Sequence, residues 1–257
     1  MKIFLIFMLL ISLIFIIFNK KYYITENFTN NYDTYVLYIP ERYNYIKSTM
    51  DKVGLNPKYI KGYDIKDFTD NKILKNKLVT TKWLNDTNNK VKYIKPYNIG
   101  RVVCHMSHIK ILKKFLNSDK EYALIIEDDI NISDKNIKNK IDNISNNIPN
   151  DADIVYLSYC FEYCNKTTKI NKIFNKSYRP LCRHIYMVTK KGAIKIIDKT
   201  IPMFSSGDRM IGHLIKNKKL ISYNVNPNYL YLKQKRNNNN PIFETKLDNI
   251  GEHNLCM

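Results

Sequence analysis

The chain has 257 residues, 44% of them hydrophobic and 25% charged, which is the composition of a globular protein with one sizeable domain and appendages. Its net charge of +19 favours anionic partners such as nucleic acid, anionic lipid headgroups or phosphorylated small molecules. The lysines are scattered, however, and the lack of a zinc-finger or RNA-recognition signature argues against a nucleic-acid-binding module.

The N-terminus predicts a membrane anchor. Residues 3–18 are uniformly apolar apart from one serine, and lysines flank this run on both sides. No small-x-small cleavage site follows, so we expect an uncleaved signal anchor over residues 1–24, followed by a polar stem over residues 25–33. A single-pass membrane protein is therefore predicted, facing the lumen of the secretory pathway if the chain is of eukaryotic type.

Strands and helices are expected to alternate along residues 34–235. In chain order, the patterns predict a strand at 34–39, a helix at 42–53, a strand at 58–64, a loop with short helical pieces at 66–95, a helix at 107–116, a strand at 122–126, a polar helix after it, strands at 152–158 and 184–189, a helix at 190–198 and a strand at 220–225. This order is typical of an α/β domain with a largely parallel sheet. An Asn-rich tail over residues 236–257 follows.

The five cysteines, Cys104, Cys160, Cys164, Cys182 and Cys256, are too few and too irregular for a disulfide scaffold. Cys160 pairs with Cys164, or one of them with Cys182, if the compartment is oxidising. A zinc site lacks a second closely spaced Cys/His pair. Unpaired thiols in the core are the slightly favoured interpretation.

Three adjacent acids, Glu127, Asp128 and Asp129, end the apolar run in "ALIIEDDI". Ligands of open α/β sheets gather at the carboxyl ends of strands. Alternation along the chain would direct Glu127 and Asp129 to one side and Asp128 to the other. Clustered carboxylates repel each other, and Mg²⁺ or Mn²⁺ would neutralise them while bridging to substrate phosphates. Alternatively, the acids begin the next helix, where the helix dipole favours them.

The segment "GRVVCHMSHIKIL" together with "ALIIEDDI" resembles glycosyltransferase family 25, which includes bacterial lipooligosaccharide galactosyltransferases and procollagen galactosyltransferases. That family carries a Gly-Glu-x-Gly-Cys-x-x-Ser-His segment before a helix, and then a strand ending in Glu-Asp-Asp. The matching positions are Gly100, Cys104, Ser107, His108, Glu127, Asp128 and Asp129. The chain departs from the pattern at Arg101, where the family has Glu, and at Val103, where it has Gly.

Four further segments extend the resemblance over roughly residues 34–230. They are "YVLYIPERYNYIKSTMDKVGL" with Arg42, "KGYD" at 61–64, "HIYMVTKKGAIKII" and "FSSGDRMIGHL" with Asp208. Each segment is weak alone, but their order and spacing make the set fairly specific.

The resemblance implies a GT-A-type α/β domain that uses a nucleotide sugar and a divalent metal, usually Mn²⁺. Glu127 and Asp129 would bind the metal, with Asp129 the more direct ligand, and Asp128 would contact the substrate. Because the family is inverting, a base must deprotonate the acceptor hydroxyl, and Asp208 is the candidate. An orienting or acceptor-binding role for Asp208 is an equal alternative.

Other matched residues have two interpretations each. His108 either contacts donor phosphate or orients the acids, or it is a capping or core histidine. Ser107 binds substrate or is only a helix N-cap. Arg42 reaches a phosphate or is a solvated helix residue. Cys104 packs in the core, because nothing nearby supplies a nucleophilic triad.

The leading hypothesis is therefore a membrane-anchored, metal-dependent glycosyltransferase that moves galactose or glucose from a UDP-sugar to an acceptor hydroxyl. The acceptor would be a glycan, a lipid-linked glycan or a collagen-like hydroxylysine. Arg101 and Val103 motivate a second hypothesis, a catalytically silent relative that binds sugars or acts as a scaffold. A membrane-tethered nucleic-acid binder ranks last, because charge alone does not explain the acidic cluster.

Overall fold

The computed structural model describes residues 31–85 and 98–235. The expected anchor over residues 1–24 and the Asn-rich tail over 236–257 lie outside this part of the chain. Within the described ranges, no helix has the length and hydrophobicity that a membrane span requires. Residues 32 and 33 of the predicted stem belong to the first strand.

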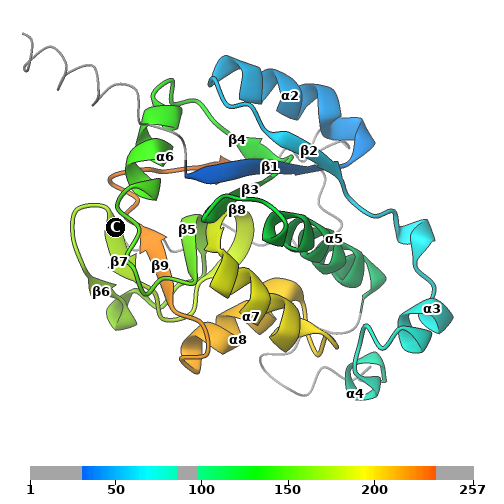
Figure 1. Cartoon of the computed structure of the whole chain (residues 1–257). Helices are drawn as coiled ribbons and strands as arrows, with labels where there is room; N and C mark the ends of the chain where they lie inside the picture. Colours follow the sequence, from blue (N-terminus) through cyan, green and yellow to red (C-terminus); the bar gives the residue numbers. More distant parts are fainter. Residues whose placement is uncertain (1–30, 86–97, 236–257) are drawn as a thin grey trace, which may run out of the picture. The chain divides into compact units, whose positions relative to one another are not determined.

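An eight-stranded sheet forms the centre of the domain, in the order β2-β1-β3-β8-β5-β9-β7-β6 (Figure 1). The strands are β1 (Tyr32–Tyr38), β2 (Lys58–Lys61), β3 (Tyr122–Glu127), β5 (Ile154–Cys160), β6 (Thr168–Lys169), β7 (Phe174–Lys176), β8 (Leu181–Thr189) and β9 (Ser222–Val225). Two further short strands, β4 (Ile130–Asn131) and β10 (Lys233–Gln234), pair with each other.

The α/β prediction is confirmed, but the sheet is mixed rather than largely parallel. β1 pairs in parallel with β2 and β3, and β5 pairs in parallel with β9. β8 lies between β3 and β5 and runs antiparallel to both. Hydrophobic patterning shows which residues are buried but not the direction of a strand, so the sequence did not reveal this inserted antiparallel strand.

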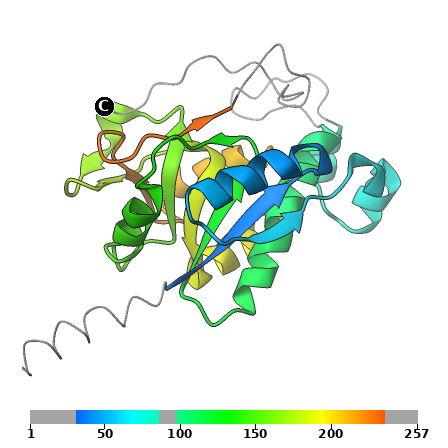
Figure 2. The ribbon, with the colours of Figure 1, turned by 90° about the horizontal axis from the view of Figure 1, so that it is seen from above.

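Helices cover both faces of the sheet (Figures 1 and 2). α2 (Tyr43–Lys52) and α6 (Ile137–Ser145) lie on one face, and α5 (Ile99–Leu116), α7 (Lys190–Thr200) and α8 (Gly207–Lys216) lie on the other. The shorter helices are η1 (Pro40–Arg42), η2 (Ile65–Asp67), α3 (Asp70–Lys75), α4 (Thr81–Leu84) and η3 (Cys164–Lys166).

The burial of β3 on both faces of the sheet explains why its sequence is a continuous apolar run. Leu124 and Ile126 belong to the core beneath α2 and α6, whereas Ala123 and Ile125 belong to the core beneath α5, α7 and α8. A strand that is covered on both faces needs apolar residues at every position. The run therefore ends where the sheet ends, and the acids begin there.

The carboxyl ends of β1, β3 and β5 share one edge of the sheet, because these strands run in the same direction, and the antiparallel β8 starts there. The pairing of β5 with β8 shifts register between Tyr156 and Cys160, so that Leu181 and Ile185 on β8 face Cys160 and Ser158. The start of β8 therefore bulges. Cys182 within the bulge has a φ of 62°, and the backbone there turns away from regular extended geometry.

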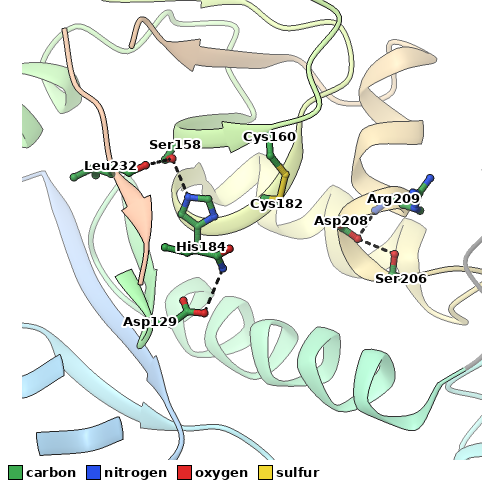
Figure 3. The surroundings of a disulfide bond; sticks show 10 residues. Asp129, Ser158, Cys160, Cys182, His184, Ser206, Asp208, Arg209 and Leu232 are labelled. Carbon is green, nitrogen blue, oxygen red and sulfur yellow. Dashed lines mark hydrogen bonds between the residues drawn. A yellow bond between two sulfur atoms is a disulfide. The ribbon is translucent and has the colours of Figure 1, made fainter. Parts of the chain in front are cut away.

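A disulfide between Cys160 and Cys182 joins the end of β5 to this bulge, with a Cα–Cα distance of 5.6 Å (Figure 3). The favoured expectation of unpaired core thiols was therefore wrong for these two residues. The sequence offered several pairings, and only the adjacency of β5 and β8 selects this one. Cys104 is a free thiol.

Replacing both Cys160 and Cys182 with serine should lower the free energy of unfolding by about 3 kcal/mol, because the bond closes a loop of about 22 residues in the unfolded chain. Thermal unfolding of the double variant, with Cys104→Ser as the control for loss of a thiol, measures this. Equal unfolding midpoints for wild type and double variant would show that the bond contributes nothing to stability.

Candidate functional site

Asp128 is held by the segment that follows β1. Its carboxylate accepts hydrogen bonds from the Ile39 backbone N–H at 2.6 Å and from Arg42 Nη1 at 3.0 Å. The Arg42 side chain is only 13% exposed, and its Nη1 also lies 3.7 Å from Asp129 Oδ2. Arg42 is therefore not a solvated helix residue; it neutralises part of the acidic cluster.

The expected separation of Asp128 from Asp129 by strand alternation is wrong. β3 ends at Glu127, and Asp128 and Asp129 form a turn before β4, so both reach Arg42. The alternative that the acids start a helix is also wrong, because α6 begins only at Ile137.

Asp129 carries the least compensated carboxylate of the three. Oδ2 accepts a hydrogen bond from Gln234 Nε2 at 3.4 Å, whereas the buried Oδ1 has no partner among the described residues. Burial, followed by the charges of Glu127 and Asp128, raises the pKa of Asp129 to about 7. Such a group favours either a proton or a cation at Oδ1.

Glu127 contacts α5 and also lies close enough to Asp129 for its charge to act there. His108 Nε2 lies 2.8 Å from Glu127 Oε1, and His108 Nδ1 lies 3.0 Å from the Tyr186 hydroxyl. Burial lowers the pKa of His108 well below its ordinary value, with Arg183 acting in the same direction, so the ring is neutral. Tyr186 then donates to Nδ1, and Nε2–H donates to the carboxylate. This geometry fits both a core histidine, since the ring is fully buried, and the interpretation in which His108 orients Glu127.

A second group of possible metal ligands includes Glu127. Ligand atoms of Cys104, His108 and Glu127 all lie within 4.8 Å of one another, a combination that would suit zinc. Burial raises the pKa of the Cys104 thiol to about 12, so the thiol is protonated, and the positive charge of Arg183 is close by. A protonated thiol is a poor metal ligand, so the carboxylates remain the candidate ligands of a cation. The packing role of Cys104 stays a prediction.

Ser107 is not an N-cap. α5 starts at Ile99, and Asn98 caps it by accepting from the Gly100 N–H at 2.8 Å. Ser107 lies in the middle of this helix, where its hydroxyl donates to the Val103 carbonyl at 2.8 Å and accepts from the Tyr63 N–H at 2.9 Å. These bonds tie α5 to the segment after β2.

Asp208 lies in the first turn of α8. Its Oδ1 accepts from the Ser206 hydroxyl at 2.7 Å and from the Arg209 N–H at 2.8 Å (Figure 3). Its charge acts on Glu127 and on Arg183, which places it in the same electrostatic neighbourhood as the acidic cluster.

Sequence reasoning missed Arg183 and His105, both of which are buried. Arg183 stands in the bulge of β8, and His105 comes from α5 with Nε2 2.8 Å from the Thr200 hydroxyl. A signal was present, because an arginine and a histidine precede an otherwise apolar strand in "CRHIYMV". Nothing in that pattern shows that the arginine faces Glu127 and Asp208.

Gly207 allows Arg183 and His105 to approach the start of α8. A Cβ at this position would overlap Arg183 Nη2 and His105 Nδ1. We expect Gly207→Ala to lower the free energy of unfolding by about 1–3 kcal/mol through overpacking. Gly212→Ala on the same helix is the milder comparison, since its added Cβ would lie 3.0 Å from the end of the Leu181 side chain and 3.2 Å from the Pro180 carbonyl, against 2.4 Å contacts at Gly207. Equal losses in the two variants would contradict this tight contact.

The stability of the metal-free protein should fall as the pH rises towards 7. Burial raises the pKa of Glu127, Asp128 and Asp129 alike, so the folded state binds more protons than the unfolded state above the ordinary carboxyl range. For Asp129, the interval from 3.8 to about 7 corresponds to at most about 4 kcal/mol. Thermal unfolding between pH 4.5 and 8 in chelator should show this slope, and Asp129→Asn should flatten it. An unchanged slope in that variant would exclude Asp129 as its source.

Charge balance supports a divalent cation at this edge. When ionised, Glu127, Asp128, Asp129 and Asp208 would carry four negative charges, while Arg42 and Arg183 supply two positive charges. The unpartnered Oδ1 of Asp129 is a hard oxygen ligand of the kind that Mg²⁺ and Mn²⁺ prefer. The residues present therefore fit such an ion, with Asp129 and Glu127 as its holders.

The described residues thus form an α/β domain whose candidate site lies at the carboxyl edge of the sheet. The model of glycosyltransferase family 25 (LPS biosynthesis protein) matches residues 37–220, more than half of the chain. The chain therefore belongs to glycosyltransferase family 25 and is a glycosyltransferase. No individual curated protein matches it.

The departure from the family pattern at Val103 has a packing explanation. Val103 is buried in a third core cluster, with Trp83 from α4 and Met210 from α8. The larger side chain fills space between α5, α4 and α8, where a glycine would leave a void. Arg101 lies in the first turns of α5, half-buried, and nothing in the structure explains its replacement of glutamate.

Proposed function

We propose that the protein is a metal-dependent, inverting hexosyltransferase that moves galactose or glucose from a UDP-sugar to an acceptor hydroxyl. The observation that carries the proposal is the convergence of Glu127, Asp128 and Asp129 with Arg42 at one sheet edge, where Asp129 Oδ1 is buried without a partner. Such a site suits a cation and the diphosphate that it binds.

Each residue of the site has a part in this scheme. Asp129 and Glu127 would hold the cation, which when bound would offset charge on the departing diphosphate. Arg42 fixes Asp128 and Asp129. The Tyr186 hydroxyl holds the ring of His108, and His108 in turn keeps Glu127 oriented. The neutral state of His108 leaves the negative charge of Glu127 available.

The reaction is a single displacement. The acceptor oxygen forms a bond to the anomeric carbon while the bond from that carbon to the diphosphate oxygen breaks, and its electron pair leaves with the diphosphate. Asp208 accepts the proton of the acceptor hydroxyl. Its Oδ1 is held by Ser206 and by the Arg209 N–H, which fixes the carboxylate at the start of α8.

We further propose a membrane-anchored enzyme that acts on a glycan, a lipid-linked glycan or a collagen-like acceptor. The anchor proposal rests on the apolar run of residues 3–18. The Cys160–Cys182 disulfide supports an oxidising compartment, because such bonds persist there.

A donor screen tests the proposal. UDP-galactose, UDP-glucose and other nucleotide sugars are added to the full-length protein with and without Mn²⁺, and thermal shift and UDP release are recorded. The proposal predicts a Mn²⁺-dependent stabilisation and UDP release with a UDP-hexose. Silence with every donor would instead favour the catalytically silent relative that Arg101 and Val103 suggested.

A further inference from the structure

Arg183 carries a buried positive charge that no described side chain pairs with directly. The residue is 5% exposed, its Nε and Nη1 have no hydrogen-bond partner, and no ion pair involves it. Removing an arginine from water without a paired anion is costly, and proteins rarely retain such a group. The cost calls for an anionic partner other than the side chains that the structure describes.

A bulge in β8 directs Arg183 towards the candidate site. The bulge at the start of β8 contains Cys182, Arg183 and His184, and it breaks the alternation of the strand. His184 turns towards Ser158, whose Oγ lies 2.8 Å from His184 Nε2 (Figure 3). Arg183 turns towards α5 and α8, where it meets His105 and Gly207. The Cys160–Cys182 disulfide links this bulge to the end of β5.

The charges around Arg183 are those of the candidate site. Glu127 and Asp208 both act on its charge without forming an ion pair with it. Arg183 therefore supplies a buried positive charge near Glu127 and Asp208, whereas Arg42 is committed to Asp128 and Asp129.

We propose that Arg183 binds the diphosphate of the donor and stabilises the charge that develops on it as the sugar leaves, an inference that rests on the proposed function. A guanidinium presents paired N–H donors that match two phosphate oxygens. Arg183 would then contribute to binding of the diphosphate alongside Asp129 and Glu127, the residues that would hold a cation. Fixed donors aimed at a leaving group lower the barrier of transfer.

Binding by the full-length protein tests this inference. The affinities for pyrophosphate, UDP and uridine are measured by calorimetry with Mg²⁺ for wild type, Arg183→Met, Arg183→Lys and the control Arg179→Met. Arg179 is another buried arginine near the start of β8, packed against Gly212. The unfolding temperature of each ligand-free variant is recorded as well.

We expect Arg183→Met to weaken pyrophosphate and UDP about 10–100-fold, to leave uridine unchanged and to keep or raise the unfolding temperature. Arg183→Lys should recover part of the loss, and Arg179→Met should bind like wild type. Unchanged pyrophosphate and UDP affinity in Arg183→Met would overturn the inference while leaving the proposed function intact. Equal losses for all three ligands, with a lower unfolding temperature, would also overturn it, because they indicate a structural arginine.

The inference and the proposed function can fail separately. A wild type that binds pyrophosphate through Arg183 but does not bind UDP would overturn the donor assignment and retain the anion site. A wild type that binds neither would overturn both.

Discussion

Asp129→Asn should reduce glycosyl transfer by about 10³-fold while leaving the fold intact. The change keeps the shape of the side chain and its reach to Gln234, but it removes the charge and one oxygen ligand from the position where Oδ1 has no partner. Loss of several kcal/mol of electrostatic stabilisation of the leaving diphosphate corresponds to a reduction of this size. Initial rates at saturating donor and Mn²⁺ measure it.

Asp134→Asn is the matched control for this prediction. Asp134 lies five positions further along the chain, and its side chain pairs with Lys140 at 2.7 Å. It should transfer sugar at the wild-type rate. Full activity in Asp129→Asn, with unchanged Mn²⁺ dependence, would refute the assignment of Asp129 to the cation.

Asp208→Asn should lower kcat by about 10²–10⁴-fold, the usual contribution of a general base. The affinity for UDP should hardly change, because the asparagine still accepts from Ser206 and from the Arg209 N–H. Steady-state kinetics over a range of pH, together with UDP binding, separates the two quantities.

Ser206→Ala serves as the control for Asp208. It removes the hydroxyl that donates to Asp208 Oδ1 but leaves the carboxylate and the Arg209 N–H in place. We expect a reduction well below that of Asp208→Asn. If Asp208→Asn retained kcat and instead weakened the acceptor KM, Asp208 would be an acceptor-binding residue, the alternative that the sequence left open.

Local patterns predicted most of the individual elements. The apolar run before Glu127 predicted β3, and the spacing of Ile109, Leu112 and Phe115 predicted the buried face of α5. Both features depend on burial, which a linear sequence records directly. The start of α5 was placed eight residues too late, because its first turns pack against α4 and α8 in a separate cluster rather than on the sheet.

The composition of the candidate site was only partly predictable. The acids and His108 stand in recognisable segments, and the structure joins His108 to Glu127 at 2.8 Å. The pairing of Arg42 with Asp128 spans 86 positions and depends on the parallel pairing of β1 with β3. Arg183 escaped detection because its direction is set by a bulge, and a bulge depends on the register of two strands rather than on local residue preference.

Calorimetric titration of Mn²⁺ into the UDP-bound protein is the most direct test of the claim that these acids form a cation site. The account predicts saturable binding by wild type and by Asp134→Asn, and at least 100-fold weaker binding by Asp129→Asn, about 3 kcal/mol in binding free energy. Equally tight Mn²⁺ binding by Asp129→Asn, or no Mn²⁺ binding by wild type, would contradict it.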